Sequence, residues 1–180
     1  MESRPPADSS GPPLDASLIA PLHDAVSLFS ALHIPYALVG GIAAMLYGRL
    51  RATEDVDFVA SATHQEVLRA NPQAMREFHF DPGCTWKLYH DSGVEIDIWK
   101  DEYSQDIAAR ANTVPFDGQD VRLADVHDLL AMKLRAARFQ DDYDVSEILQ
   151  HASINESLLQ QHVTPEQFRR FLDIKRRTLA

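Results

Sequence analysis

Two aspartates separated by one residue are the first candidates for chemistry in this chain. Asp55-Val56-Asp57-Phe58 alternates acidic and apolar residues, which is typical of a β-strand, and residues i and i+2 of a strand project from the same face. Two neighbouring carboxylates repel each other, and a hard divalent cation such as Mg2+ relieves that repulsion. The alternative is that Asp55 and Asp57 lie on a solvated edge strand without a ligand.

A second segment with the same alternation offers a third carboxylate. In residues 94–98, Glu95 and Asp97 share one face of a predicted strand. If this strand lies beside the first, Asp97 joins the pair. Three convergent carboxylates can hold two magnesium ions and a nucleoside triphosphate. Asp97 could also take the proton from an acceptor hydroxyl.

A glycine pair between a predicted strand and a predicted helix is a candidate phosphate site. Gly40-Gly41 follows the apolar run at residues 36–39 and precedes an Ala-rich helix at residues 42–47. Without side chains there, backbone N–H groups at the helix start can approach a phosphate closely. A tight turn with no ligand is the alternative.

The elements that must position these groups follow from apolar periodicity and turn residues. The pattern predicts an α+β fold, with a mixed β-sheet core followed by a C-terminal helical portion. We expect a disordered leader at residues 1–14, the core at 15–123 and the helical portion at 124–180. The predicted strands are residues 36–39, 55–60, 85–89, 94–99, 113–116 and 121–123, with hairpin turns at His90–Gly93 and Asp117-Gly118. The predicted helices are residues 18–32, 42–47, 63–70, 124–137, 143–151, 157–162 and one that opens at Thr164-Pro165.

Composition narrows the class of protein. The single cysteine excludes a disulfide within the chain and a two-cysteine zinc site. No stretch resembles a secretory signal or a membrane span, so we expect a cytoplasmic protein with no membrane partner. A net charge of −10 argues against general binding of polyanions. Residues 165–180 nevertheless hold five basic and two acidic side chains, either a solvated helix face or a contact for RNA or an acidic partner.

The segment from Tyr36 to Phe58 resembles the DNA polymerase β-type nucleotidyltransferase superfamily, in the branch related to AbiEii-type toxins of bacterial toxin–antitoxin systems. That branch has an apolar strand, Gly-Gly, a short helix, a glycine with a nearby arginine, and then Arg-x-Thr-x-Asp-x-Asp. The matching residues here are Gly40, Gly41, Gly48, Arg51, Thr53, Asp55 and Asp57, and Asp97 stands where a third carboxylate is expected. A second match runs from Asp128 to Asp144 through Lys133, with one departure at Gln140, where a basic residue is common. The resemblance covers roughly residues 35 to 150.

The resemblance implies roles for these residues. Asp55, Asp57 and Asp97 would bind metal and carry catalysis, with two Mg2+ ions present when a nucleoside triphosphate is bound. Gly40, Gly41, Arg51, Thr53 and Lys133 would bind the nucleotide. Lys133 could instead be an ordinary lysine on a helix surface, and Asp141 and Asp144 are expected to orient the helix junction. Trp86, Trp99 and Tyr89 could stack on a nucleobase, or pack in the core or at its rim.

The resulting prediction is a magnesium-dependent enzyme that moves a nucleoside monophosphate from a triphosphate to an acceptor hydroxyl. The acceptor could be RNA, a protein or a small molecule. The resemblance favours the toxin of a bacterial toxin–antitoxin or defence system, with a possible cognate antitoxin as partner. One alternative is modification of an antibiotic of the aminoglycoside type, because a polycation would suit an acidic cleft. The other is a non-catalytic protein that binds a nucleotide or a partner on the same fold.

Overall fold

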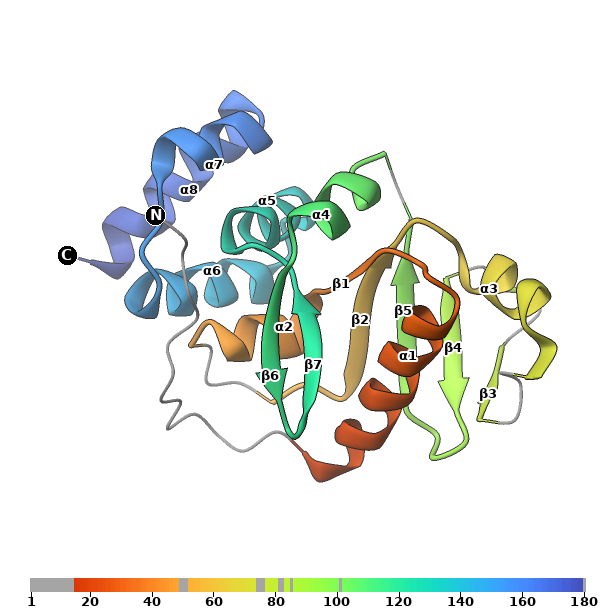
Figure 1. Cartoon of the computed structure of the whole chain (residues 1–180). Coiled ribbons are helices and arrows are strands. Elements are labelled where there is room, and N and C mark those ends of the chain that lie inside the picture. Colours follow the sequence, from red (N-terminus) through yellow and green to blue (C-terminus); the bar gives the residue numbers. More distant parts are fainter. Residues whose placement is uncertain are drawn as a thin grey trace. The chain divides into compact units, whose positions relative to one another are not determined.

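The computed structural model describes residues 15–48, 52–73, 77–80, 83–84, 86–100 and 102–179 (Figure 1). These residues form two compact units. The sheet unit comprises residues 15–42 and 52–124, and the helical unit comprises residues 43–48 and 125–179. The predicted leader at residues 1–14 lies outside the described residues, and the predicted division of the chain at residue 123 stays a prediction.

A mixed sheet with seven strands in the described residues forms the centre of the sheet unit, as the sequence predicted. The strand order is β3-β4-β5-β2-β1-β7-β6. β2 and β5 pair in parallel, as do β1 and β7, and the remaining neighbours are antiparallel. The strands are β1 (Tyr36–Leu38), β2 (Asp55–Ala60), β3 (Phe78–His79), β4 (Lys87–His90), β5 (Glu95–Trp99), β6 (Asn112–Phe116) and β7 (Gln119–Leu123).

Helix α1 (Ile19–Ala31) supplies the apolar cover of the central strands and follows the short 3-10 helix η1 (Ala16–Leu18). Its Phe29 ring stacks on Tyr36 of β1, with centroids 5.2 Å apart, and meets Phe58 of β2 edge to face at 5.3 Å. All three side chains are nearly inaccessible to solvent. This cluster occupies the face of β2 that Val56 and Phe58 share, which leaves the other face to Asp55 and Asp57.

Two further helices complete the sheet unit. Helix α3 (His64–Ala70) begins after Thr63, which forms a capping box with Glu66, as its predicted start at residue 63 suggested. Helix α4 (Ser104–Arg110) lies against β1 and β2. Helix α2 (Gly40–Leu46) starts directly after β1, and its residues are divided between the two units.

The hairpin turns carry the residues that their geometry requires. Asp117 and Gly118, between β6 and β7, have φ angles of +45° and +85°. Positive φ at both central residues is the mark of a type I′ turn, whose twist matches the twist of paired strands. The hairpin predicted at this dipeptide is therefore present, with Val114 opposite Val121.

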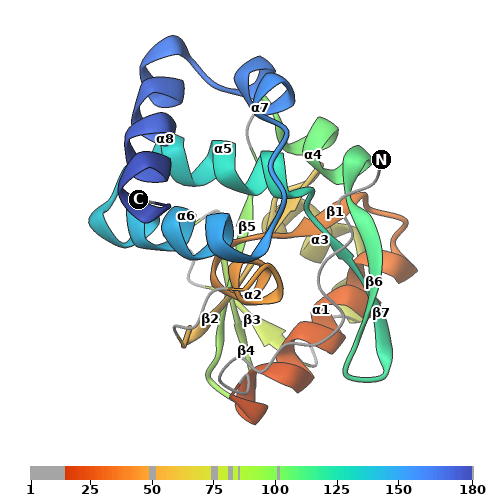
Figure 2. The same ribbon diagram turned by 90° about the vertical axis from the view of Figure 1, so that its left-hand side faces the viewer.

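The helical unit consists largely of four helices that pack on one another (Figure 2). They are α5 (Val126–Ala136), α6 (Phe139–His151), α7 (Glu156–His162) and α8 (Pro165–Thr178). Helix α8 opens as predicted, with Thr164 as its cap and Pro165 in its first turn. Within the unit, a Cβ built at Gly48 would lie 2.4 Å from Cβ of His151, so this glycine packs directly against α6.

Several boundaries differ from the sequence prediction. Helix α6 begins at Phe139 rather than at residue 143, because the carboxylate of Asp141 accepts from the backbone N–H of Arg138 and so stabilises a first turn at that point. Helix α2 begins at Gly40 rather than at residue 42, so the glycine pair forms its first turn. Strand β3 and helix α4 were not predicted. Within the described ranges, no helix combines the length and the apolar character needed to cross a bilayer.

Candidate active site

The register of the parallel pair β2–β5 gathers the predicted carboxylates. Asp57 lies directly opposite Asp97, and Asp55 lies opposite Glu95. One carboxylate oxygen from each of Asp55, Asp57 and Asp97 lies within 4.8 Å of the others. The condition on which the third carboxylate depended, that its strand neighbours the first, is therefore met. The two strands run side by side at the centre of the sheet (Figure 1).

The same alternation that directs the acids outward fills the core behind them. Val56 and Phe58 of β2, like Ile96 and Ile98 of β5, are completely buried. Fully burying one such side chain contributes about 1.5–3 kcal/mol. A one-residue slip of either strand would move the acids into the core, so the apolar residues determine the position of the site.

Each carboxylate of the triad has its own surroundings. The hydroxyl of Thr53 donates to Asp55 Oδ1 at 2.7 Å, and the indole N–H of Trp99 donates to Asp57 Oδ1 at 3.4 Å. Lys87 Nζ lies 3.9 Å from Asp97 Oδ1 and forms a closer ion pair with Glu95. Asp97 Oδ1 itself is buried and accepts no hydrogen bond from the described part of the chain.

The negative charges around Asp97 outnumber the positive ones. Burial raises the pKa of Asp97 to about 6, and the neighbouring carboxylates of Asp57, Asp55 and Glu95 add to the increase, while Lys87 opposes it. The pKa of Lys87 is raised in turn, chiefly by its hydrogen bond to Glu95. Three oxygen donors with an unsatisfied buried oxygen and mutual repulsion fit a hard divalent cation. The residues present therefore suit Mg2+ by the chemistry of their donor set.

Gly40 lies so close to Asp57 that no larger residue can occupy its position. Its φ of +65° is in the left-handed region, and a Cβ built there would lie 1.8 Å from Asp57 Oδ2. The preceding N–H, of Val39, donates to the backbone oxygen of Asp57 at 2.9 Å. The first turn of α2 is thus held directly against the carboxylate of Asp57.

Residues 18–178 match the family described as "Nucleotidyltransferase of unknown function (DUF6036)". The chain belongs to this nucleotidyltransferase family. No curated protein is similar enough in sequence to serve as a relative.

Solved structures share the fold of this nucleotidyltransferase. An antigenic nucleotidyltransferase-like protein from Paracoccidioides brasiliensis has a TM-score of 0.60 and 22% identity, over 90% of this chain and 88% of that one. The antibiotic-resistance factor ANT(2'')-Ia has a TM-score of 0.55 and 14% identity, over 92% and 95%. The lincosamide antibiotic adenylyltransferase LnuA, bound to lincomycin, has a TM-score of 0.50 and 15% identity, over 75% and 96%.

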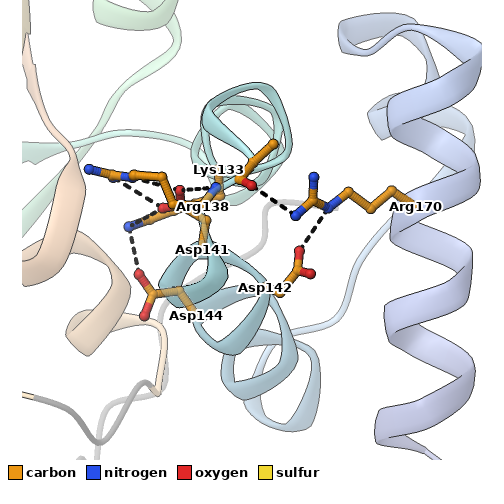
Figure 3. Close-up of polar contacts among 7 residues, drawn as sticks. Lys133, Arg138, Asp141, Asp142, Asp144 and Arg170 are labelled. Atoms are coloured by element: carbon orange, nitrogen blue, oxygen red, sulfur yellow. Dashed lines mark hydrogen bonds and ion pairs between the residues drawn. The ribbon is translucent and has the colours of Figure 1, made fainter.

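Lys133 of this nucleotidyltransferase lies in the helical unit, inside a network of charges (Figure 3). Its Nζ is 2.6 Å from Asp144 Oδ2 and 3.5 Å from Asp141 Oδ1. Arg138 donates to Asp141 from its side chain, at 2.8 Å, and from its backbone N–H, at 3.0 Å. Burial alone would raise the pKa of Asp141, but Arg138 and Lys133 outweigh it and lower that pKa.

Lys133 is therefore not an ordinary surface lysine, since only 7% of the residue is exposed. Its ammonium ties α5 to α6, and Arg170 of α8 reaches Asp142 of α6 at 2.8 Å and the backbone oxygen of Ala137 at 3.0 Å. Asp141 and Asp144 orient the helix junction, as expected. A role of Lys133 at the nucleotide stays a prediction.

The remaining predicted site residues divide into two groups. Thr53 lies at the triad through its bond to Asp55, whereas Arg51 lies outside the described residues. Sequence reasoning missed Lys87, although the hairpin contains the signal. A turn at residues 90–93 pairs Tyr89 with Glu95 and therefore Lys87 with Asp97.

Proposed function

We propose that this nucleotidyltransferase moves a nucleoside monophosphate from a triphosphate to an acceptor hydroxyl, with Mg2+ held by Asp55, Asp57 and Asp97. The observation that carries the proposal is the in-register row of Asp57 and Asp97, with a buried oxygen of Asp97 that lacks a hydrogen-bond partner in the described chain. Such an arrangement destabilises the site without a cation and is explained by one. Two ions are expected with the triphosphate bound.

The transfer step balances with the residues present. The acceptor oxygen forms a bond to the α-phosphorus, the bond from that phosphorus to the bridging oxygen breaks, and pyrophosphate leaves. The proton of the hydroxyl passes to Asp97, whose carboxylate lies beside those of Asp55 and Asp57. Bound magnesium would supply neutralisation of phosphate charge and activation of the hydroxyl. Thr53 and Trp99 orient the carboxylates of Asp55 and Asp57.

The nucleotide contacts belong to the proposal as well. Gly40 lies against Asp57 at the start of α2 and Gly41 follows it in the same turn, and we propose that backbone N–H groups of this turn contact the phosphates. Arg51, Thr53 and Lys133 are proposed nucleotide contacts by resemblance to the AbiEii-like branch. In the structure, the Thr53 hydroxyl donates to Asp55, so a nucleotide contact of Thr53 would be made beside a metal ligand. The ammonium of Lys133 is paired with Asp141 and Asp144, which would hold it in place for a phosphate contact.

The biological context that we propose is that of a cytoplasmic toxin in a bacterial toxin–antitoxin or defence system, with a cognate antitoxin as partner. The support is the resemblance to the AbiEii-type branch. RNA is a less favoured acceptor than a small molecule or a protein. The chain carries a net charge of −10, and several basic side chains of α8 are engaged: Arg170 pairs with Asp142, Lys175 with Glu156 and Arg176 with Asp173.

Modification of an antibiotic is the second candidate function. The fold is shared with ANT(2'')-Ia and with a lincosamide adenylyltransferase, and an acidic protein suits a cationic drug. A non-catalytic binding protein on this fold is disfavoured, because all three carboxylates are present and close together.

Transfer of label tests the proposal. The protein is incubated with each α-labelled triphosphate, magnesium and a cell extract, beside an Asp55→Ala, Asp57→Ala double variant. Label in RNA, protein or a small molecule that depends on the carboxylates would support the enzyme and name its acceptor. Absence of both transfer and magnesium-dependent triphosphate binding would refute it. Growth arrest on induction, relieved by Asp57→Ala, favours the toxin, whereas drug resistance without arrest favours antibiotic modification.

A further inference from the structure

Two exposed tryptophans stand beside the carboxylate triad. Trp86 is 50% exposed and Trp99 is 43% exposed, and their rings stack with centroids 6.5 Å apart and planes 10° from parallel. They are the only two tryptophans in the chain. Large indole surfaces are normally covered in a folded protein, and a pair left open next to polar groups is typical of a ligand surface.

The pair is tied to the site by Trp99. This residue follows Asp97 by two positions on β5, so the two side chains share one face of the sheet. Its indole N–H reaches Asp57 Oδ1 at 3.4 Å. A molecule held on the indoles would therefore lie beside the group bound at the triad.

The order of the strands places the proposed phosphate contacts and the two tryptophans on opposite sides of the triad. Across the sheet the order is β1, β2, β5 and β4. The proposed phosphate contacts, Gly40 and Gly41, follow β1, whereas Trp99 is on β5 and Trp86 directly precedes β4. In phosphoryl transfer the incoming and leaving oxygens are roughly in line through the phosphorus. If pyrophosphate leaves toward the β1 side, the acceptor approaches from the β5 and β4 side, where the tryptophans are.

Charge indicates the class of acceptor. Among the described residues, the face that the pair borders carries the carboxylates of Asp55, Asp57, Glu95 and Asp97 and the ammonium of Lys87. The charge of bound magnesium would be offset by that of the triphosphate, so the excess of carboxylates remains. The faces of indole rings attract cations, and Trp does so more strongly than the other aromatic side chains. Aromatic faces beside excess carboxylates thus complement a positive charge.

We propose that Trp86 and Trp99 form the acceptor subsite, and that the acceptor is a small molecule with a cationic group near its reacting hydroxyl. This inference rests on the proposed function, because it assigns the acceptor side of the same transfer. It places the specificity for the acceptor in the sheet unit, on residues that are not themselves metal ligands.

Intrinsic fluorescence is a direct test, because both tryptophans of the chain are in the pair. The full chain, with magnesium and the α,β-methylene analogue of each nucleoside triphosphate, is titrated with choline. The matched control is 3,3-dimethylbutan-1-ol, which has the same shape and hydroxyl without the charge. We expect choline to change the fluorescence at a concentration about tenfold lower than its neutral isostere does.

Variants separate the pair from the rest of the site. Trp86→Leu should weaken choline binding by about three- to tenfold, read from Trp99, and Trp86→Phe should largely restore it, because the aromatic face returns. Both variants should bind the magnesium–triphosphate analogue as the original chain does, measured by calorimetry. A parallel titration with matched sodium chloride corrects for ionic strength.

Three results of these titrations would count against the proposals. Equal responses to choline and its isostere, or none to either, would overturn the cationic acceptor. A fluorescence change on nucleotide addition that is lost in Trp86→Leu together with nucleotide affinity would assign the pair to the nucleobase and overturn the proposal. Failure of every triphosphate analogue to bind with magnesium would instead refute the proposed function on which the inference depends.

Discussion

Replacing Asp97 by asparagine should make the metal-free protein more stable rather than less. The folded-state pKa of Asp97 is raised from 3.8 to about 6, so folding opposes ionisation of this group. The contribution of Asp97 to the free energy of unfolding is therefore fully present below about pH 4 and is lost as the pH rises to about 6. A shift of about 2 pKa units corresponds to about 3 kcal/mol.

Asparagine is nearly isosteric and cannot ionise, so it avoids this loss. The attraction of Lys87, 3.9 Å from Asp97 Oδ1, is already included in the pKa of about 6, and part of the gain is offset because the buried amide needs hydrogen-bond partners of its own. We therefore expect Asp97→Asn to raise the free energy of unfolding by about 1–3 kcal/mol at about pH 8 in EDTA. For a chain of this size that is roughly 3–10 °C in melting temperature. Near pH 4 the two proteins should melt together.

Magnesium should remove or reverse this difference in stability between the two proteins. A ligand that binds only the folded state stabilises it by about 2.7 kcal/mol at one hundred times its dissociation constant. The original chain should gain this stabilisation, and Asp97→Asn should not. Thermal melts with and without magnesium at several pH values would measure the difference. Asp120→Asn, at an exposed strand position, is the matched control and should change stability by less than about 0.5 kcal/mol. A variant that is less stable at about pH 8 in EDTA would refute the assignment of a repulsive triad.

Three more substitutions test the site and its support. Gly40→Ala should lower stability by about 2 kcal/mol or more in chemical denaturation and abolish magnesium binding in calorimetry, because its Cβ would overlap Asp57 Oδ2; unchanged magnesium affinity would contradict this contact. Thr53→Val should weaken magnesium binding by about tenfold, and Thr53→Ser should restore it, because the hydroxyl orients Asp55 at 2.7 Å; equal affinities in the two variants would argue against that bond. Lys133→Met should lower the free energy of unfolding by about 3–5 kcal/mol, since it leaves Asp141 and Asp144 buried without their ammonium partner. Lys100→Met, which breaks an exposed pair with Glu66, should cost under about 1 kcal/mol, and similar losses in both lysine variants would refute the buried network.

The carboxylate row was accessible from sequence because it depends on a local rule. Alternation at residues 55–58 and 94–98 determines which side chains share a face, and the buried partners Val56 and Ile96 follow from the same pattern. That the two strands are neighbours could only be assumed from the sequence, because parallel pairing joins segments that no local pattern connects. The pairing of β2 with β5 in the structure establishes it.

Other features depend on contacts that no pattern reveals. Helix α4 was missed because its buried face is short, formed mainly by Ser104, Ile107 and Ala108. The position of Gly40 against Asp57 arises from the path of the chain between β1 and α2. The burial of Lys133 between two aspartates comes from the packing of α5 on α6, and its sequence context alone was compatible with a solvated lysine.

The parallel pairing of β2 with β5 also has a consequence for the order of folding. Hairpins such as β4–β5 and β6–β7 join neighbouring segments and can form early, whereas β2 must find a strand some 40 positions along the chain. The ligand atoms for a cation converge only when this late, non-local step is complete. A cation bound there should therefore act mainly on the escape from the native state, slowing unfolding while leaving the rate of folding nearly unchanged.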